Sequence, residues 1–100
     1  MESTELLNKI EKASRIIKKQ FSDQGLSGTI ASIVSQLDFI KNDMKNSGPD
    51  GPSAKKQDVE RIILGLQAIR EIESQNEELS DMLCDIDYAY KKLHGIKMDA

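Results

Sequence analysis

Few side chains of this chain have the chemistry that a catalytic or metal site requires. The sequence of 100 residues contains one cysteine, Cys84, and one histidine, His94, and both fall on or next to one predicted helix. That pairing suits neither a metal cluster, which needs several converging ligands, nor a nucleophile with its base. We therefore predict that the protein is not an enzyme, with no catalytic residues, no metal and no cofactor.

Carboxylates are the other chemically active groups, and they are unevenly distributed. The segment from Glu71 to Asp87 contains seven acidic residues and no lysine or arginine, whereas the segment from Lys9 to Lys19 contains five basic residues and one acidic residue. The net charge of −3 argues against nucleic acid as a partner, because the phosphate backbone requires a basic surface. The acidic run is either a solvated helix face or a surface for a basic protein partner.

The position of Tyr88 favours the interpretation of the acidic run as a binding surface. At about 100° per residue, Tyr88 shares a helix face with Asp81 and Asp85, and that face is opposite Leu83 and Ile86. Aromatic side chains are enriched at protein interfaces, although a tyrosine that packs along its neighbours' stems is the alternative. As a hypothesis, the candidate binding residues are Glu71, Glu73, Glu77, Asp81, Asp85 and Tyr88.

Four helices are expected to position these groups. Apolar residues recur every three or four positions, which predicts helices at about 4–22, 27–45, 55–73 and 77–94. The segment 46–53 contains two prolines and two glycines, so it is predicted to be a loop. We expect one domain over residues 1–100 with an all-α fold, a compact antiparallel bundle of about four helices.

The helix at 55–73 is expected to lie at the centre of the bundle. Gly65 lies within its apolar stripe, and a glycine inside a helix costs roughly 0.5–1 kcal/mol relative to alanine. The close approach of a neighbouring helix would compensate for that cost. The stripe is predicted to contain Val59, Ile62, Ile63, Leu66, Ile69 and Ile72, and the inner stripe of the last helix Leu79, Met82, Leu83, Ile86, Tyr90 and Leu93.

The chain has no feature that directs it to a membrane. No uninterrupted apolar run approaches the roughly 20 residues of a membrane span, and the amino terminus does not have the pattern of a secretory signal. A single cysteine rules out an internal disulfide, so we expect a reducing cytoplasm. Apolar surface left over by the bundle would favour a homodimer, and this alternative stays open.

Three segments of the chain resemble a known family. The first is Gln36-Leu37-Asp38-Phe39-Ile40, and the second is Leu64-Gly65-Leu66-Gln67-Ala68-Ile69-Arg70-Glu71. The third joins Glu78-Leu79-Ser80, Asp85 and Tyr88 to Gly95-Ile96-Lys97-Met98-Asp99. In this order they resemble the small helical immunity proteins of bacterial type VI secretion systems, specifically those that neutralise an NAD(P)+ glycohydrolase effector. The resemblance covers about Ile30 to Asp99, and the loop at 46–53 looks longer than the family's.

The resemblance implies a cognate inhibitor that acts in the bacterial cytoplasm. Such a protein binds the toxin domain and blocks the cleft where the dinucleotide enters, and it has no catalytic activity. The acidic candidate residues would take the place of the dinucleotide's phosphates against basic groups of the effector. Two alternatives stay open, namely an immunity protein to a toxin of different chemistry and a helical adaptor or regulatory module.

Overall fold

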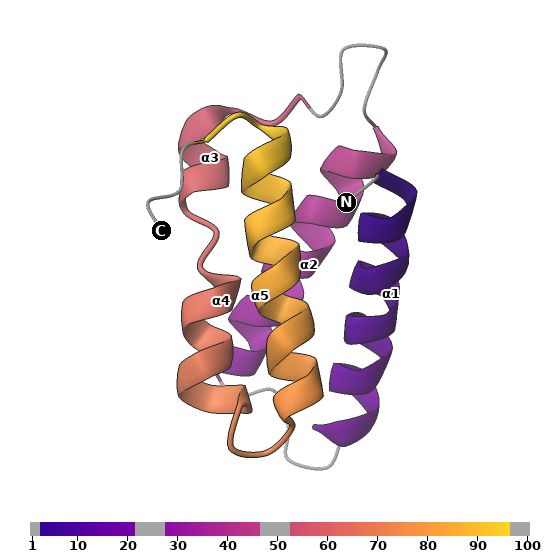
Figure 1. Ribbon diagram of the computed structural model, residues 1–100, viewed down its shortest axis with the longest axis vertical. Coiled ribbons are helices and arrows are strands. Elements are labelled where there is room, and N and C mark those ends of the chain that lie inside the picture. Colours follow the sequence, from indigo (N-terminus) through magenta and orange to yellow (C-terminus); the bar gives the residue numbers. More distant parts are fainter. Residues whose placement is uncertain (1–2, 22–27, 47–52, 97–100) are drawn as a thin grey trace.

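The helices form four roughly antiparallel walls around one core (Figure 1). The computed structural model describes residues 3–21, 28–46 and 53–96. These parts of the chain contain helices and no β-strand, which confirms the predicted all-α bundle. The middle of the predicted loop, residues 47–52, lies outside the described residues, as do residues 22–27 between the first two helices.

Three of the walls are single helices, and the remaining wall is broken. The continuous helices are α1 (Ser3–Gln20), α2 (Gly28–Lys45) and α5 (Glu77–Leu93). The third wall along the chain consists of three short pieces, α3 (Lys56–Glu60), α4 (Leu64–Gln67) and the π-helix η2 (Ala68–Ile72).

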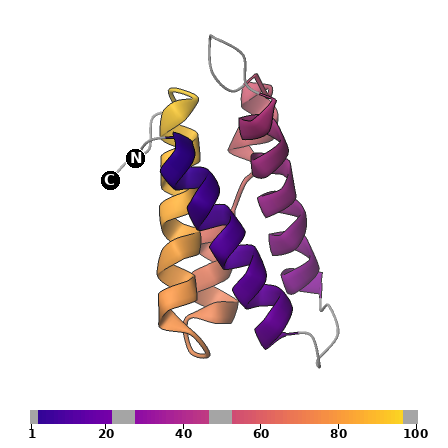
Figure 2. The same ribbon diagram turned by 90° about the vertical axis from the view of Figure 1, so that its right-hand side faces the viewer.

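In the part of the chain that the structure describes, the four walls make a ring, with no helix at its centre. α5 packs against α1 on one side and against α4 and η2 on the other, while α2 packs against α1 and α4. Figure 2 shows α1 running obliquely from the α5 side of the molecule to the α2 side. The prediction that the segment 55–73 lies at the centre is therefore wrong, because this segment forms one wall of the ring.

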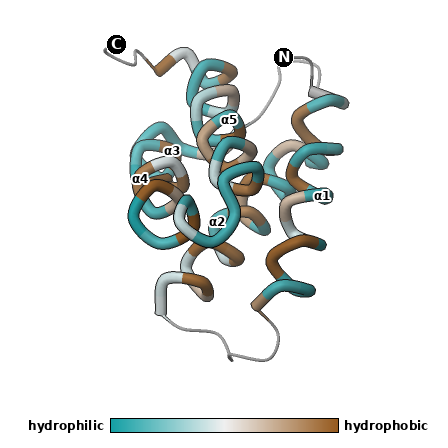
Figure 3. The backbone as a smooth tube through the Cα atoms, turned by 60° about the horizontal axis from the view of Figure 1, so that its bottom comes forward, coloured by the Kyte–Doolittle hydropathy of each residue, from teal (hydrophilic) through white to brown (hydrophobic). Residues whose placement is uncertain are grey.

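The apolar stripes of the three continuous helices fill the core. Apolar and hydrophilic positions alternate along the helices, as expected of amphipathic helices packed on one face (Figure 3). Burying a large apolar side chain stabilises the fold by roughly 1.5–3 kcal/mol. The prediction for α5 is confirmed except at Leu93, which is 38% exposed. The largest fully buried side chains of these three helices are Leu6, Ile10, Ile17, Ile33, Leu37, Ile40, Leu79, Leu83, Ile86 and Tyr90.

The third wall differs from the continuous helix predicted at 55–73. α3 ends at Glu60, and Ile63 has a non-helical backbone with φ of −130° and ψ of 32° before α4 begins. The later π-helix is closed by a bond of 2.9 Å from the N–H of Glu73 to the carbonyl of Ala68, five residues before it. The break and the π-turn together rotate the following side chains away from the positions that a regular helix would give them.

Burial along the third wall follows from this rotation. Val59, Ile62 and Ile72 are buried as predicted, but Leu64 and Ala68 take the other inner positions. Ile63 is 42% exposed, Leu66 is 48% exposed and Ile69 is 58% exposed. The prediction that these three are core residues is therefore wrong.

Both ends of α5 have well-defined caps. The side chain of Asn76 accepts a hydrogen bond of 3.0 Å from the N–H of Leu79, as expected for an N-cap. At the other end Gly95 has a φ of 72°, and the N–H of Ile96 donates to the carbonyl of Lys91 at 3.0 Å. This is the Schellman arrangement, in which glycine takes the left-handed conformation without strain.

A buried carboxylate joins the end of α2 to the end of α5. Asp43 accepts hydrogen bonds from the hydroxyl of Tyr90 at 2.5 Å and from the backbone N–H groups of Ser53 and Ala54 at 2.9 and 3.0 Å, and Nε2 of His94 lies 2.9 Å from it. Burial alone would raise the pKa of Asp43, but these hydrogen bonds outweigh it and hold the pKa below its usual value. Burial and the neighbouring carboxylate raise the pKa of Tyr90, so its hydroxyl stays protonated and donates. His94 therefore makes a tertiary contact in addition to its position at the helix end.

Candidate partner-binding face

The break is the segment 61–63 between α3 and α4. Gln36 of α2 binds this break from one side. Its Oε1 accepts a hydrogen bond of 2.7 Å from the N–H of Ile63, the last residue before α4. Its Nε2 donates to Oε1 of Gln67 at 2.6 Å and to Ser32 on its own helix. One amide side chain thus satisfies a backbone donor that the interrupted helix leaves without an internal partner.

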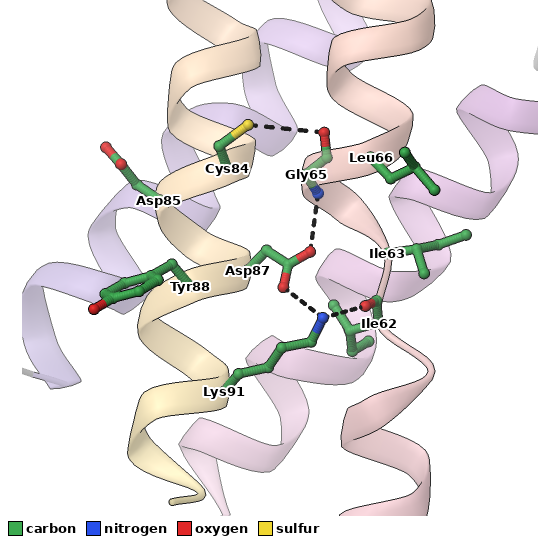
Figure 4. A pocket seen from close by; sticks show the side chains of 9 residues that line it. All are labelled: Ile62, Ile63, Gly65, Leu66, Cys84, Asp85, Asp87, Tyr88 and Lys91. Atoms are coloured by element: carbon green, nitrogen blue, oxygen red, sulfur yellow. Dashed lines mark hydrogen bonds and ion pairs between the residues drawn. The ribbon is translucent and has the colours of Figure 1, made fainter. Parts of the chain in front are cut away.

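Two charged residues of α5 bind the break from the opposite side (Figure 4). Oδ2 of Asp87 accepts from the N–H of Gly65 at 2.9 Å, and Nζ of Lys91 donates to the carbonyl of Ile62 at 2.6 Å. Lys91 also lies 2.9 Å from Oδ1 of Asp87, and the side chains of the pair are only 16% and 9% exposed. Charges this deeply buried persist when each is paired and hydrogen-bonded, as both are here.

In the sequence, Asp87 is one more carboxylate of an acidic run, and Lys91 has no predicted role. A signal was present, because Asp87 and Lys91 lie four residues apart and each directly follows a buried residue of the inner stripe, Ile86 or Tyr90. Charges placed beside an apolar stripe in this way point towards a neighbouring helix rather than towards water.

Gly65 lets α5 approach the third wall closely. A Cβ at this position would lie 3.5 Å from Oδ2 of Asp87 and 3.8 Å from both Cα and Sγ of Cys84. The predicted close approach of a neighbouring helix is confirmed. A methyl group would just fit in van der Waals contact, whereas a larger side chain would push α4 away from α5.

A groove of about 550 Å³ runs between the third wall and α5 (Figure 4). Ile63 and Leu66 form one edge, while Asp85 and Tyr88 form the other. Asp85 and Tyr88 also line a second groove of about 490 Å³, together with Ala89, Lys92 and Leu93. Tyr88 is 54% exposed, as its position on α5 predicted, and it forms a ridge between the two grooves.

We call this surface the α4–α5 face. It combines exposed apolar side chains with carboxylates of α5, and it is formed by Ile63, Leu66, Ile69, Asp81, Asp85 and Tyr88. The sequence placed the polar half of this face and missed the apolar half, because the three third-wall residues were assigned to the core. Contiguous exposed apolar groups rimmed by charges are typical of protein-binding surfaces.

All six candidate residues from the sequence are exposed, but only some lie together. Asp85 and Tyr88 line the groove, and Asp81 lies one turn before Asp85 on α5. Glu73 lies near enough to influence Cys84 together with Asp81 and Asp85. The other four candidates, Glu71, Glu73, Glu77 and Asp81, line neither of the two grooves.

The basic residues of α1 neutralise part of the acidic surface. Nζ of Lys9 lies 3.2 Å from Asp85, and Nζ of Lys12 lies 3.8 Å from Glu78. Within the described parts of the chain, no cation lies at ion-pair distance from the other four carboxylates of the candidate set, which are Glu71, Glu73, Glu77 and Asp81. These four carboxylates lie between the second half of η2 and the second turn of α5.

Cys84 lies beside the groove but is not poised for nucleophilic chemistry. Burial, followed by the charges of Asp81, Asp87 and Asp85, raises the pKa of its thiol. A thiol that stays protonated is a poor nucleophile and a poor metal ligand. Among residues 3–21, 28–46 and 53–96, no three histidine, cysteine or acidic side chains converge as a metal ion would require, and no helix is long and apolar enough to cross a membrane.

Comparison with protein families gives a match over most of the chain. The family model described as Tsi6 matches residues 5–92, which is most of the chain and includes all four walls. The comparison with curated proteins and the comparison with solved structures gave no match.

Proposed function

The chain belongs to the Tsi6 family of type VI secretion immunity proteins, and we propose that it neutralises its cognate toxin through the α4–α5 face. The observation that carries this proposal is the exposure of Ile63, Leu66 and Tyr88 along one groove, which the carboxylate of Asp85 also lines. Central aromatic and apolar anchors supply most of the binding energy of an interface, while a charged rim speeds association.

The finer part of the proposal concerns the toxin. We propose a NAD(P)+ glycohydrolase whose substrate cleft is occluded, because such a cleft has basic groups that hold the dinucleotide phosphates. Carboxylates such as Glu73 and Asp81 would take the place of those phosphates. The interaction would take place in the bacterial cytoplasm, where the toxin would deplete the dinucleotide pool.

Two other functions are compatible with the same surface. Immunity proteins diverge together with their toxins, so the fold is also suited to a toxin of different chemistry. A helical adaptor or regulatory module is the third candidate. Complex formation and the partner's activity together separate all three.

The first test is a pull-down against the protein encoded next to this chain, followed by an NAD-consumption assay of that partner. We expect a stable complex in which NAD loss stops. A stable complex without NAD chemistry would move the target to another toxin class. The absence of a complex would favour the adaptor.

The second test locates the surface. Tyr88→Ala is expected to cost about 2 kcal/mol or more of binding free energy, roughly a 30-fold loss of affinity, because it removes a central aromatic anchor. Asp81→Lys is expected chiefly to slow association. Asp38→Lys, the same charge reversal at an exposed position of α2, is the matched control and should bind like the parent. Unchanged affinity of Tyr88→Ala and Asp81→Lys, with both variants folded, would mean that the toxin binds elsewhere.

A further inference from the structure

The third wall contains two apolar stripes, of which only one can face the core. Leu64, Ala68 and Ile72 recur every four residues and are buried. The other stripe, Ile63, Leu66 and Ile69, recurs every three residues and is exposed. In a continuous helix, this second stripe would join Val59 and Ile62 on the inner side, as the sequence pattern alone predicts.

We propose that Gln36, Asp87 and Lys91 are positioning residues of the α4–α5 face, which hold the third wall in its broken register and so keep Ile63, Leu66 and Ile69 turned towards the partner. The role of the partner rests on the proposed function above. The choice of register does not, because it is a property of the free chain.

Hydrogen bonding explains why these three side chains select the register. In a continuous helix the carbonyl of Ile62 would accept from the N–H of Leu66, and the N–H of Gly65 would donate to the carbonyl of Arg61. At the break those roles pass to Lys91 and Asp87. Without Asp87 and Lys91, the broken register would leave the partly buried N–H of Gly65 and carbonyl of Ile62 without these partners, which costs free energy.

The three contacts come from both neighbours of the third wall. Gln36 reaches the break from α2, and the Asp87–Lys91 pair reaches it from α5. The segment from Ile62 to Gly65 is thus bound on two sides, at successive backbone groups. This arrangement fixes both the position of the break and the rotation of α4 after it.

Stability alone does not account for a buried ion pair at this place. Well-packed apolar side chains of similar volume usually stabilise a fold as well as such a pair does, because both charges lose their hydration. The broken register also leaves three large apolar side chains in water that a continuous helix would cover. The best-attested use of buried polar groups is to select one register among alternatives, and here the selected register exposes the apolar half of the α4–α5 face.

The test follows the exposure of the apolar stripe directly. Leu66→Cys, made in a Cys84→Ser background, gives one thiol whose alkylation rate by iodoacetamide reports the register. Added to this background, Gln36→Leu or Lys91→Met is expected to lower the alkylation rate several-fold, because position 66 turns inward. Gln67→Leu is the matched control, since it alters the same amide network but keeps the bond from Gln36 to the N–H of Ile63. Lys91→Arg, which keeps the cation, is expected to restore the rate.

Affinity for the toxin is measured separately, in chains without the thiol probe. Gln36→Leu is expected to weaken binding by tenfold or more, and Gln67→Leu by less than twofold. An alkylation rate that is unchanged or higher in both Gln36→Leu and Lys91→Met would overturn the proposal, and so would equal losses of affinity in Gln36→Leu and Gln67→Leu. If the parent chain binds no toxin, the proposed function fails, while the alkylation rates still decide the register. If Lys91→Met does not fold, Gln36→Leu carries the test.

Discussion

α5 and the third wall face each other across the groove, yet they satisfy their backbones in different ways. α5 is one regular helix of 17 residues, with an internal hydrogen-bond ladder and a cap at each end. The third wall is interrupted, and side chains from α2 and α5 take over part of its backbone pairing. This difference explains where hydrophobic periodicity predicts burial correctly. The periodicity is reliable where a helix makes its own backbone hydrogen bonds, as α5 does. It fails where side chains of neighbouring helices bind the backbone, as in the third wall.

The two walls also contribute differently to the α4–α5 face. α5 supplies a regular row of side chains, in which Asp81, Asp85 and Tyr88 point outward because Leu83 and Ile86 point inward. The third wall supplies Ile63 and Leu66 only because its register is broken. Half of the face thus follows from the helix pattern, and the other half depends on tertiary contacts.

The largest expected effect comes from two leucines of α4 that lie two positions apart. Leu64 is fully buried, whereas Leu66 is 48% exposed. Leu64→Ala should lower the free energy of unfolding by about 2–5 kcal/mol, because it removes buried methyl groups and leaves a cavity. Leu66→Ala, the matched control, should change it by no more than about 0.5 kcal/mol. Urea denaturation of both variants measures the difference. Equal losses would mean that Leu66 is packed as tightly as Leu64, contrary to the broken register, which buries Leu64 and exposes Leu66.

The sequence was sufficient for the overall fold because the three continuous helices carry strong periodic patterns. It also predicted the outward position of Tyr88 and the close approach at Gly65. It did not predict the break between α3 and α4, since the residue types of Ile62 and Ile63 do not mark the end of a helix. The bonds that interrupt the helix come from Gln36, Asp87 and Lys91, which are 22 to 29 positions away from their partners. A local pattern carries no information about partners at that separation.

A second comparison lies within α5, between its two tyrosines. Tyr90 is buried and donates to Asp43, whereas Tyr88 is exposed on the α4–α5 face. Tyr90→Phe should lower the free energy of unfolding by about 1.5–3 kcal/mol, because hydrogen bonds to a charged group are stronger than neutral ones. Tyr88→Phe is the same substitution at the exposed site and should be within about 0.5 kcal/mol of the parent. Thermal or urea unfolding measures both.

A double-mutant cycle assigns that loss to the hydrogen bond. In an Asp43→Asn background, Tyr90→Phe should cost clearly less than it does in the parent chain. An identical cost in both backgrounds would mean that the hydroxyl of Tyr90 stabilises the bundle independently of Asp43. The sequence missed this contact for the same reason that it missed the break, because Asp43 and Tyr90 lie on helices far apart in the chain.

The smallest expected effect is a pH dependence that originates at Asp43. The folded-state pKa of this carboxyl lies below the unfolded-state value of about 3.9. Between the two values the unfolded chain binds more protons than the folded chain, so stability falls as the pH drops through that window. The contribution of Asp43 is therefore complete above the unfolded-state pKa and is lost in more acidic solution.

We expect the difference in unfolding free energy between the parent and Asp43→Asn to shrink from about pH 5 to about pH 2, as urea denaturation at each pH would show. Asp38→Asn removes an exposed carboxyl from the same helix and should leave that difference nearly constant. A constant difference for Asp43→Asn as well would mean that the hydrogen bonds from Tyr90, Ser53 and Ala54 do not favour the charged form, and that the end of α5 is joined to α2 by packing alone.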